Sequence, residues 1–334
     1  MNQQLTGATL TAEEVKFDES LRPQKLADFI GQPRVKKSLD IALSAAAKRG
    51  QCVDHVLFYG PPGLGKTTLA HIVAKVQGGN IHITAGPALT RAGDLAALLT
   101  NLEPNDVLFI DEIHRIPSAV EETLYSAMED GRLDIVLGKG PAARSVSIEL
   151  KPFTLIGATT RYGALSAPLR SRFGIISKLE YYENNDLAQI IMRSAKILGI
   201  SVTPEAALTL AVRSRGTPRI ANRLLRRARD YGQLSDATIL DNSHITNTVE
   251  LLEIDTLGLD ASDRDLLTLI ITHHHGGPVG LSTLASALSE DIGTIEEVYE
   301  PYLIQRGLLA RTKQGRVVTD LAYSHLGLTR VDPL

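Results

Sequence analysis

The sequence near residue 60 reads Gly60-Pro61-Pro62-Gly63-Leu64-Gly65-Lys66-Thr67. This matches Gly-x-x-x-x-Gly-Lys-Thr, which is a phosphate-binding loop when it joins a strand to a helix. The required context is present, because an apolar run precedes the loop at 55–59 and a helical pattern follows at 67–76. Glycines let the backbone curl around phosphates, and loop N–H groups and the helix N-terminus attract anions. The stretch therefore predicts a nucleotide site in which Lys66 reaches the β- and γ-phosphates and Thr67 holds Mg²⁺.

Short apolar runs alternate with helical patterns between residues 53 and 184. Runs of this length are typical of strands that are buried on both faces of a sheet. Strands that alternate with helices indicate a parallel sheet with crossover helices, so we predict an α/β core around the phosphate loop. The runs are residues 55–59, 81–84, 107–110, 153–156 and 174–176.

The pattern changes near residue 184, where the strand signals stop. Helical patterns begin near Asp186, at Thr203-Pro204 and at Pro218, and another lies near 243–253. Proline is well suited to the first position of a helix, so these starts are specific. This part of the chain is predicted to be a small all-helical domain.

A third unit is predicted from about residue 256. Its first helix is expected at 262–273 with Ser262 as N-cap, and further helical stretches are expected near 281–289 and 294–306. A hairpin is expected at 308–319, which favours a winged-helix module, although a plain helical cap also fits. The predicted domains are residues 1–182, 183–254 and 255–334.

Two carboxylates follow the third apolar run, about 45 residues after the phosphate loop. Asp111 is expected to hold the magnesium shell, and Glu112 to polarise the attacking water as general base. Thr159 and Thr160 end the fourth run, at the sheet edge where ligands bind. A hydroxyl there, for which Thr160 is the candidate, senses the γ-phosphate in one interpretation and caps the strand in the other.

Arginines are needed because hydrolysis builds negative charge on the phosphates. Arg170 and Arg172 lie just before the fifth run, where either could act as a finger, within one chain or from a neighbouring subunit. Arg219 follows Gly216-Thr217-Pro218, so a helix start fixes its position. The plainer alternative is solvent exposure, because 213–229 contains seven arginines and no acid.

Composition limits the classes of function. The 334 residues include 35 Lys and Arg against 38 Asp and Glu, a net charge of −3, so any DNA contact needs a local basic patch. The single cysteine, Cys52, excludes an internal disulfide and a cysteine-based zinc site. Residues 1–17 lack an apolar signal core and no membrane-length apolar run occurs, which predicts a cytoplasmic protein with no membrane association.

A local basic patch does occur in the predicted hairpin. Residues 306–316 contain four basic side chains and no acid, namely Arg306, Arg311, Lys313 and Arg316. A small basic wing can hold the phosphates of a duplex without reading sequence. An exposed basic turn with no partner is the alternative interpretation.

Several segments resemble AAA+ ATPases and, within them, the RuvB family of bacterial Holliday-junction branch-migration motors. The phosphate loop, Asp111-Glu112-Ile113-His114 and the segment 169–173 are similar to AAA+ proteins in general. More specific similarity to RuvB covers about residues 17–327. The segments that carry it are Arg22-Pro23, 29–32, 138–145, 157–161, 215–223 and 298–303.

The resemblance implies an ATP-driven motor for recombination and DNA repair that binds ATP or ADP with Mg²⁺. It implies a homo-oligomeric, hexameric ring on double-stranded DNA at Holliday junctions, with a RuvA-like junction-binding protein and a RuvC-like resolvase as partners. The segment 133–150 is expected to form the hairpin that docks on the RuvA-like partner, and Arg311 and Arg316 to touch the DNA backbone.

The resemblance also implies a role for individual site residues. Around the nucleotide it places the loop residues Gly63, Gly65, Lys66, Thr67 and Thr68, and the adenine neighbours Leu21, Arg22 and Tyr182. Arg219 is implied as a second sensor, and Arg172, with Arg170 beside it, as the finger at a subunit boundary. Glu129 and Asp130 are implied to lie near a neighbour's nucleotide.

Some positions depart from the family's pattern. Lys313-Gln314 stand in the wing where the family commonly has proline-arginine. Lys313 can replace part of the lost charge, and Arg316 is the preferred DNA contact. Gly131 replaces a usually bulky residue beside Glu129-Asp130, and Tyr162 replaces a small one after 157–161. Ser147 and Lys151 alter the charge of the docking hairpin.

Other interpretations remain at this stage. A clamp-loader-type AAA+ subunit lacks the winged helix and the segment 138–145. A nucleotide-switched DNA-binding protein that hardly hydrolyses ATP has little use for Glu112 and two finger candidates. A Glu112→Gln variant distinguishes these two interpretations. If it abolishes neither ATP hydrolysis nor DNA translocation, the motor interpretation is wrong.

Overall fold

The computed structural model describes residues 17–137 and 144–330. The chain forms two compact units, of which the first comprises Met1–Leu21 with Tyr182–Leu334 and the second Arg22–Tyr181. Among the described residues, no helix has the length and apolar character that a membrane crossing requires.

The second unit is built on a parallel sheet of order β2-β3-β6-β1-β7. All five predicted strands are confirmed within a few residues. They are β1 (Val56–Tyr59), β2 (Ile81–Ala85), β3 (Val107–Asp111), β6 (Thr154–Thr159) and β7 (Ile175–Lys178). Because β6 lies between β1 and β3, the ends of these three strands meet at one edge of the sheet.

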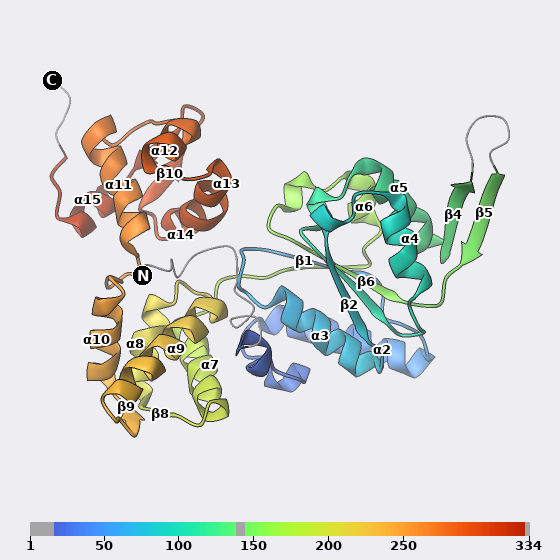
Figure 1. The fold of residues 1–334 in the computed structure, drawn as a ribbon, viewed down its shortest axis with the longest axis horizontal. Coiled ribbons are helices and arrows are strands. Elements are labelled where there is room, and N and C mark those ends of the chain that lie inside the picture. Colours follow the sequence, from blue (N-terminus) through green and yellow to red (C-terminus); the bar gives the residue numbers. More distant parts are fainter. Residues whose placement is uncertain (1–16, 138–143, 331–334) are drawn as a thin grey trace. The chain divides into compact units, whose positions relative to one another are not determined.

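Helices cover both faces of this sheet (Figure 1). Leu57 and Leu108 point into a core shared with helices α4 and α5, whose buried members include Leu95 and Leu124. Strand residues that alternate with these are equally buried, Val56 and Phe58 among them. Burial on both faces explains the uninterrupted apolar runs in the sequence. The helices are α2 (Pro33–Arg49), α3 (Lys66–Gln77), α4 (Ala92–Thr100), α5 (Ser118–Glu129) and α6 (Ala167–Ser171).

A two-stranded hairpin projects from the second unit (Figure 1). It pairs β4 (Arg132–Leu137) with β5 (Arg144–Glu149) in antiparallel register, so the hairpin expected at 133–150 is confirmed. Leu133 is fully buried in the α4–α5 core and anchors its base. The tip at 138–143, which carries part of the family-specific segment, lies outside the described residues.

The His55 ring, just before β1, connects β6 to α5 through two hydrogen bonds. The Leu155 amide donates to its Nδ1 at 2.9 Å, and its Nε2 donates to the Met128 carbonyl at 3.2 Å. Both nitrogens are used by the neutral ring, and burial lowers the pKa of His55 below its ordinary value.

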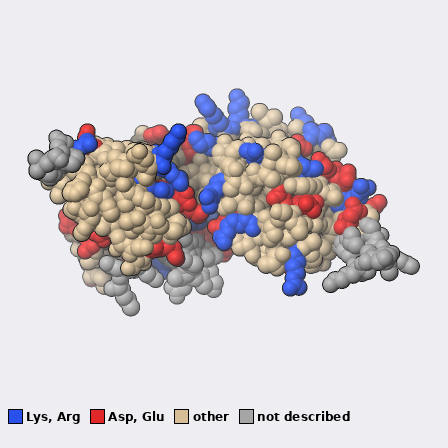
Figure 2. Space-filling view, turned by 90° about the horizontal axis from the view of Figure 1, so that it is seen from above, with Lys and Arg blue, Asp and Glu red and all other residues tan. Residues whose placement is uncertain are grey.

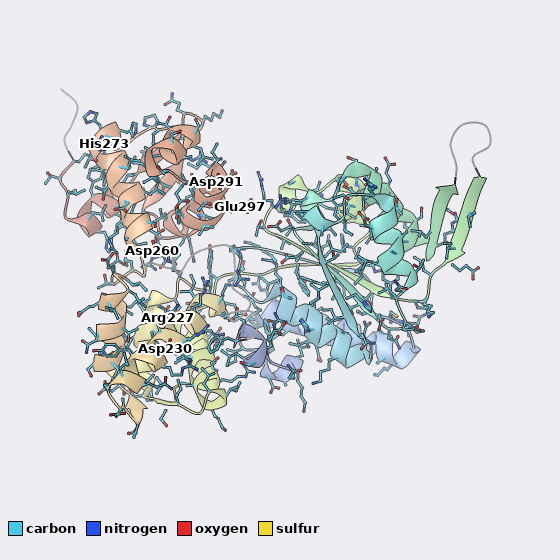
Figure 3. All side chains as sticks on the ribbon, viewed as in Figure 1. Arg227, Asp230, Asp260, His273, Asp291 and Glu297 are labelled. Carbon is cyan, nitrogen blue, oxygen red and sulfur yellow. The ribbon has the colours of Figure 1, made fainter. Side chains whose placement is uncertain are left out.

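Acidification should therefore weaken the second unit through His55. As pH falls, the unfolded chain takes up a proton near its ordinary pKa of about 6.5 before the folded ring does. The stabilisation is present above that pH and is lost as pH falls toward the lowered folded pKa. Urea unfolding at pH 7.5 and 5.5 should show a smaller loss of stability in His55→Gln than in the unaltered chain. The exposed His273→Gln is the control (Figure 3), and equal pH dependence in all three proteins would contradict the assignment.

The first unit begins with a helical domain. Its helices are α7 (Asn184–Ile197), α8 (Pro204–Arg213), α9 (Pro218–Leu234) and α10 (Asn242–Leu251). Thr203 caps α8 through its side chain, and Pro204 and Pro218 occupy first helical positions as predicted. Two very short strands, β8 (Ser201–Val202) and β9 (Ile239–Leu240), pair in parallel and were not predicted, since two residues leave no periodic signal.

The remaining helices and hairpin of the first unit follow the predicted order. They are α11 (Ala261–His274), α12 (Leu281–Leu288), α13 (Ile292–Thr294), η6 (Ile295–Tyr299), α14 (Glu300–Gln305), β10 (Leu309–Arg311), β11 (Arg316–Val318) and α15 (Asp320–Leu326). The helix expected at 294–306 contains a π-helical turn just before Pro301. Proline has no N–H for the regular ladder, which explains the irregular turn.

The predicted N-cap of α11 is wrong. Asp260, not Ser262, begins the helix: its carboxylate accepts from the Asp263 amide at 3.1 Å, and the Asp263 carboxylate accepts from the Asp260 amide at 3.0 Å. This reciprocal capping box satisfies two helix-end donors, whereas a serine satisfies one. Ser262 therefore lies inside the helix.

Candidate nucleotide and DNA sites

The phosphate loop lies between β1 and α3, as predicted. Lys66 is 8% exposed, and its ammonium donates to the carbonyls of Gly60 and Pro61 at 2.8 and 2.7 Å. The loop therefore curls around its own lysine. This brings the lysine charge and the N-terminus of α3 to the same place, which is the arrangement that attracts a phosphate.

Two glycines in the loop are required by close packing and backbone conformation. Gly60 has φ +142°, and a Cβ there would collide with the Leu179 carbonyl oxygen. Gly65 has φ +98°, and a Cβ there would lie 3.2 Å from the Phe29 ring. Residues with side chains rarely adopt these φ values. The loop can therefore keep its shape only with glycine at these positions.

Asp111 ends β3, and Glu112 follows in a left-handed conformation with φ 47°. Such a conformation is unfavourable for a residue with a side chain, and it is common at active sites. Gly86 packs directly on this turn, because a Cβ at Gly86 would collide with the Glu112 carbonyl oxygen. The Glu112 carboxylate accepts from Arg115 at 2.8 Å in an exposed ion pair. Sequence reasoning missed both Gly86 and Arg115 as neighbours of the predicted base.

The threonines after β6 lie between the loop strand and the carboxylate strand, since β6 pairs with both β1 and β3. Thr159 is buried, its hydroxyl lies 2.9 Å from His114 Nδ1, and it accepts from the Arg161 amide. Thr160 is the first residue beyond the strand and is only partly buried. Of the two, Thr160 is thus the more accessible hydroxyl at the edge where the loop and Asp111 also end.

The residues at this edge fit a magnesium ion that is shared with phosphates. Mg²⁺ in such sites takes one or two protein oxygens, and the rest come from phosphate and water. Thr67 lies in the first turn of α3 and Asp111 is the last residue of β3, at the same edge, and Asp111 already accepts from the Glu112 amide at 2.9 Å. No group of three or more His, Cys, Asp or Glu that could hold a metal by itself occurs among residues 17–137 and 144–330.

Arg172, one of the two finger candidates, lies beside Glu129 at the end of α5. Arg172 donates to the Glu129 carboxylate at 2.9 Å and to the Pro168 carbonyl at 2.8 Å, and its guanidinium lies 4.2 Å from the centre of the Tyr125 ring. Asp130, the next residue after Glu129, pairs with Arg132 at 3.3 Å. The structure thus brings Arg172, Glu129 and Asp130 together on one edge of the second unit.

Arg170 has different neighbours. Its guanidinium lies 5.3 Å from the centre of the Tyr162 ring, and Tyr162 in turn stacks on Tyr59 with ring centres 4.4 Å apart. Tyr59 ends β1 immediately before the phosphate loop. The unusual tyrosine at position 162 therefore connects the strand that carries the loop to the helix that carries the finger candidates.

The predicted adenine neighbours are divided between the two units. In the second unit, Arg22 lies 2.7 Å from His71 of α3. In the first unit, the Leu21 carbonyl accepts from Arg193 at 2.9 Å, and the Tyr182 amide donates to the Gly216 carbonyl at 2.9 Å. Tyr182 is therefore held to the turn that leads to Arg219 in the first turn of α9.

The two predicted DNA-binding arginines differ in accessibility. Arg311 on β10 has a side chain that is 53% exposed and forms a surface ion pair with Glu296 at 2.8 Å. Arg316 on β11 is buried and forms a two-pronged pair with Glu300, whose side chain is 2% exposed. The sequence favoured Arg316, whereas the geometry favours Arg311 as the side chain that can reach a phosphate.

Replacing each arginine by alanine should separate these roles. Arg311→Ala should lower the slope of log affinity for duplex DNA against log salt by about 1, with stability unchanged. Arg316→Ala leaves a buried carboxylate uncompensated and should reduce the stability of this domain by about 3 to 5 kcal/mol. Salt titration and urea unfolding measure the two effects. Equal loss of stability in both variants would contradict the distinction.

Charge is mixed on the face of the molecule that is drawn in Figure 2. On the face drawn in Figure 2, basic and acidic side chains are interspersed, which agrees with the net charge of −3. With a net charge of −3, a contact with DNA depends on local groups such as Arg311.

Family models match almost the whole chain. A model described as the Holliday junction DNA helicase RuvB P-loop domain matches residues 21–179, the RuvB AAA lid domain matches 182–255, and the RuvB C-terminal winged helix domain matches 256–327. The three models match consecutive parts of the chain, which contain the phosphate loop, the helical domain and the basic hairpin in that order.

Solved structures agree with these models. The Holliday junction branch migration motor RuvB of Thermotoga maritima is 52% identical, covers 93% of this chain and 99% of its own, and has a TM-score of 0.86. A lysine-to-arginine variant of that protein is also 52% identical with a TM-score of 0.86, and the match covers 92% of this chain and 98% of the other. An arginine-to-alanine variant has the same identity and coverage with a TM-score of 0.85.

Proposed function

Because the chain belongs to the RuvB family of Holliday junction DNA helicases, we propose that identical copies form a hexameric ring that moves duplex DNA through four-way junctions. The chain is a P-loop ATPase of the branch-migration motor class. Its cytoplasmic location, where bacterial DNA is recombined and repaired, belongs to the same proposal.

One observation supports hydrolysis at this site more than any other. The phosphate loop after β1, Thr160 after β6 and the Asp111-Glu112 pair after β3 end at one edge of the parallel sheet. The residues proposed as phosphate grip, sensor and base therefore lie at the same edge of the sheet. Binding alone would not need a carboxylate in a strained turn at that edge.

The proposed hydrolysis assigns a task to each group. The loop amides and Lys66 hold the β- and γ-phosphates, and Thr68 and Gly63 belong to the same cradle. Glu112 takes a proton from water as the water oxygen attacks the γ-phosphorus and the bond to the ADP oxygen breaks. Mg²⁺, held by Thr67 and Asp111, supplies positive charge for the phosphate oxygens when bound.

The finger and the sensor extend the site beyond one unit. Arg172, with Glu129 and Asp130 beside it, is proposed to reach the nucleotide of a neighbouring subunit and to stabilise the charge that develops there. Arg219 is proposed to report the γ-phosphate to the helical domain, with Leu21, Arg22 and Tyr182 around the adenine. Hydrolysis in one subunit would then depend on the position of the next.

The two hairpins, β4–β5 and β10–β11, are the parts of the chain that we assign to partners. The β4–β5 hairpin is proposed to dock on a RuvA-like junction-binding protein, and Arg311 to contact the DNA backbone, with Arg316 behind it. A RuvC-like resolvase is the proposed third member of the complex. Because net charge is slightly negative, the junction-binding partner is expected to supply much of the DNA affinity.

The test is ATP-dependent dissociation of a synthetic four-way junction by the full chain, with and without the junction-binding partner. We expect dissociation that needs ATP and increases when the partner is present. A chain that hydrolyses ATP at the junction but dissociates it in neither condition would disprove the motor proposal and leave only the ATPase.

A further inference from the structure

Arg215 is a buried arginine between α8 and α9, immediately before the turn that leads to Arg219. It is only 4% exposed, and its backbone is left-handed with φ 53°. That conformation is unfavourable for a residue with a side chain and persists only where the surroundings hold it. The position is thus fixed by its contacts rather than by local preference.

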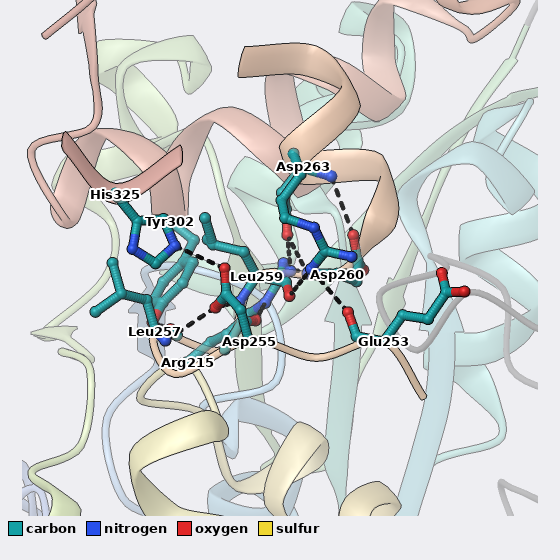
Figure 4. Close-up of polar contacts among 11 residues, drawn as sticks. Arg215, Glu253, Asp255, Leu257, Leu259, Asp260, Asp263, Tyr302 and His325 are labelled. Carbon is teal, nitrogen blue, oxygen red and sulfur yellow. Dashed lines mark hydrogen bonds and ion pairs between the residues drawn. The ribbon is translucent and has the colours of Figure 1, made fainter. Parts of the chain in front are cut away.

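The side chain of Arg215 makes several contacts outside the helical domain (Figure 4). Nε donates to the Gly258 carbonyl at 2.8 Å, and Nη2 donates to the Asp263 carboxylate and lies 3.5 Å from the Asp260 carboxylate. The guanidinium also lies 5.1 Å from the centre of the Tyr302 ring. One side chain of the helical domain therefore contacts the connecting segment, the start of α11 and α14.

The acceptors of Arg215 are themselves held in place. Asp260 and Asp263 form the capping box of α11, and Asp263 is fully buried. The Tyr302 hydroxyl donates to the Leu257 carbonyl, and burial raises the pKa of Tyr302 so that it stays a donor. Asp263 Oδ1 is buried without a hydrogen-bond partner, but the other carboxylate oxygen holds both Arg215 and the Asp260 amide. Buried polar contacts of this kind favour one orientation of the parts that they join.

The connecting segment between the domains is bonded along its length. Asp255 accepts from the amides of Leu257 and Leu259, both at 2.9 Å, and lies 2.7 Å from His325 of α15. Gly258, with φ +81°, passes so close to α8 that a Cβ would lie 2.7 Å from the Arg213 carbonyl oxygen. These contacts do not describe a flexible linker.

The backbone that follows Arg215 is also held in place by hydrogen bonds. The turn that follows it is closed by the Thr217 amide on the Ser214 carbonyl at 2.9 Å and by the Tyr182 amide on the Gly216 carbonyl at 2.9 Å. Ser214 and Thr217 are buried, and Thr217 is the N-cap of α9, which carries Arg219 two residues later. A short rigid turn therefore separates Arg219 from Arg215.

We propose that Arg215 is a positioning residue that locks the turn bearing Arg219 to the winged-helix domain, so that the two move as one body during the ATP cycle. The inference rests on the proposed function, since it takes Arg219 to face the nucleotide. A displacement of Arg219 then moves the basic hairpin of the winged-helix domain with it, as part of the same rigid body. The buried charge serves orientation, because a buried ion pair contributes little net stability compared with apolar packing.

Arg215→Lys tests this proposal with little change elsewhere. Lysine keeps the positive charge and the same backbone requirement, but its ammonium lacks the planar fork that holds Gly258 and Asp263 together. Arg227→Lys is the matched control, because Arg227 forms a half-exposed pair with Asp230 at 3.6 Å on α9 (Figure 3).

Two measurements are made on the full chain with its junction-binding partner. We expect Arg215→Lys to keep kcat and KM for ATP within about twofold and to raise the ATP consumed per junction dissociated about tenfold, a typical size for coupling between sites. In the unaltered chain, a non-hydrolysable ATP analogue should change amide hydrogen exchange in α11, and this dependence should disappear in Arg215→Lys. Arg227→Lys should behave like the unaltered chain.

The outcomes are distinguishable. Unchanged ATP consumption per junction and unchanged nucleotide-dependent exchange in Arg215→Lys would overturn the proposal, even if its melting temperature falls. Absence of any effect of the analogue on α11 in the unaltered chain would overturn it as well. Failure of the unaltered chain to dissociate junctions disproves the motor function instead, and the exchange measurement still decides the role of Arg215. If Arg215→Lys does not fold, Tyr302→Leu, which removes the ring beside the guanidinium, must show the same loss of coupling.

Discussion

Replacing Glu112 with glutamine is expected to reduce the rate of ATP hydrolysis by about 10²- to 10⁴-fold, the usual contribution of a general base. Glutamine has the size of glutamate but cannot accept the proton from water. Nucleotide affinity should remain, because Lys66 and the loop amides bind the phosphates without Glu112. The measurements are steady-state phosphate release and binding of a fluorescent ATP analogue.

The control is Glu103→Gln, since Glu103 lies before the same strand and has an exposed ion pair with Lys151. It should hydrolyse ATP at the normal rate. Loss of the pair with Arg115 accompanies Glu112→Gln, so Arg115→Ala is measured beside it and should lower the rate far less. If Glu112→Gln retains hydrolysis within about tenfold of normal, Glu112 is not the base.

Arg172→Ala is expected to lower kcat for ATP by about 10³- to 10⁵-fold in the assembled protein, which is the effect of removing an arginine finger. The positive charge at the developing phosphate charge is lost, while the subunit's own loop and base remain. Arg170→Ala, two residues earlier in α6, is the control, and we expect a much smaller effect because Arg170 packs on Tyr162. The reverse ranking would assign the finger to Arg170.

Mixed rings decide whether Arg172 acts on a neighbour. In a random mixture of Glu112→Gln and Arg172→Ala chains, about a quarter of the sites would combine an intact base with an intact finger from the next subunit. Activity should therefore rise well above that of either variant alone. A mixture that stays inactive would place Arg172 and Glu112 in the same chain's site.

Much of the second unit could be predicted from the sequence because its signals are local. A strand that is buried on both faces needs a continuous apolar run, and a loop that curls around phosphates needs glycines at set spacing. The alternation of strands and helices likewise predicted a parallel sheet with crossover helices, whereas the strand order β2-β3-β6-β1-β7 came only from the structure. The proposed roles of the site residues remain predictions, but their grouping at one sheet edge follows from that topology.

The features that the sequence did not predict depend on partners distant in the chain. Arg316 reads as a free cation of a basic wing, yet Glu300, sixteen residues earlier, buries and neutralises it. Arg215 reads as one more arginine in a charge run, yet it pairs with Asp263 in another domain. Neither pairing leaves a periodic signal, because helical and strand periods report which face is apolar and not which charges meet.

Gly86 shows that a proposed catalytic site can depend on a residue that takes no part in its chemistry. It has no side chain and takes part in no proton transfer, but its α-carbon packs where the Glu112 carbonyl must lie. Even an alanine would push the left-handed turn of Glu112 away from its place. We therefore expect a substitution of residue 86 to impair ATP hydrolysis by displacing the proposed base, although the two residues are distant in the sequence.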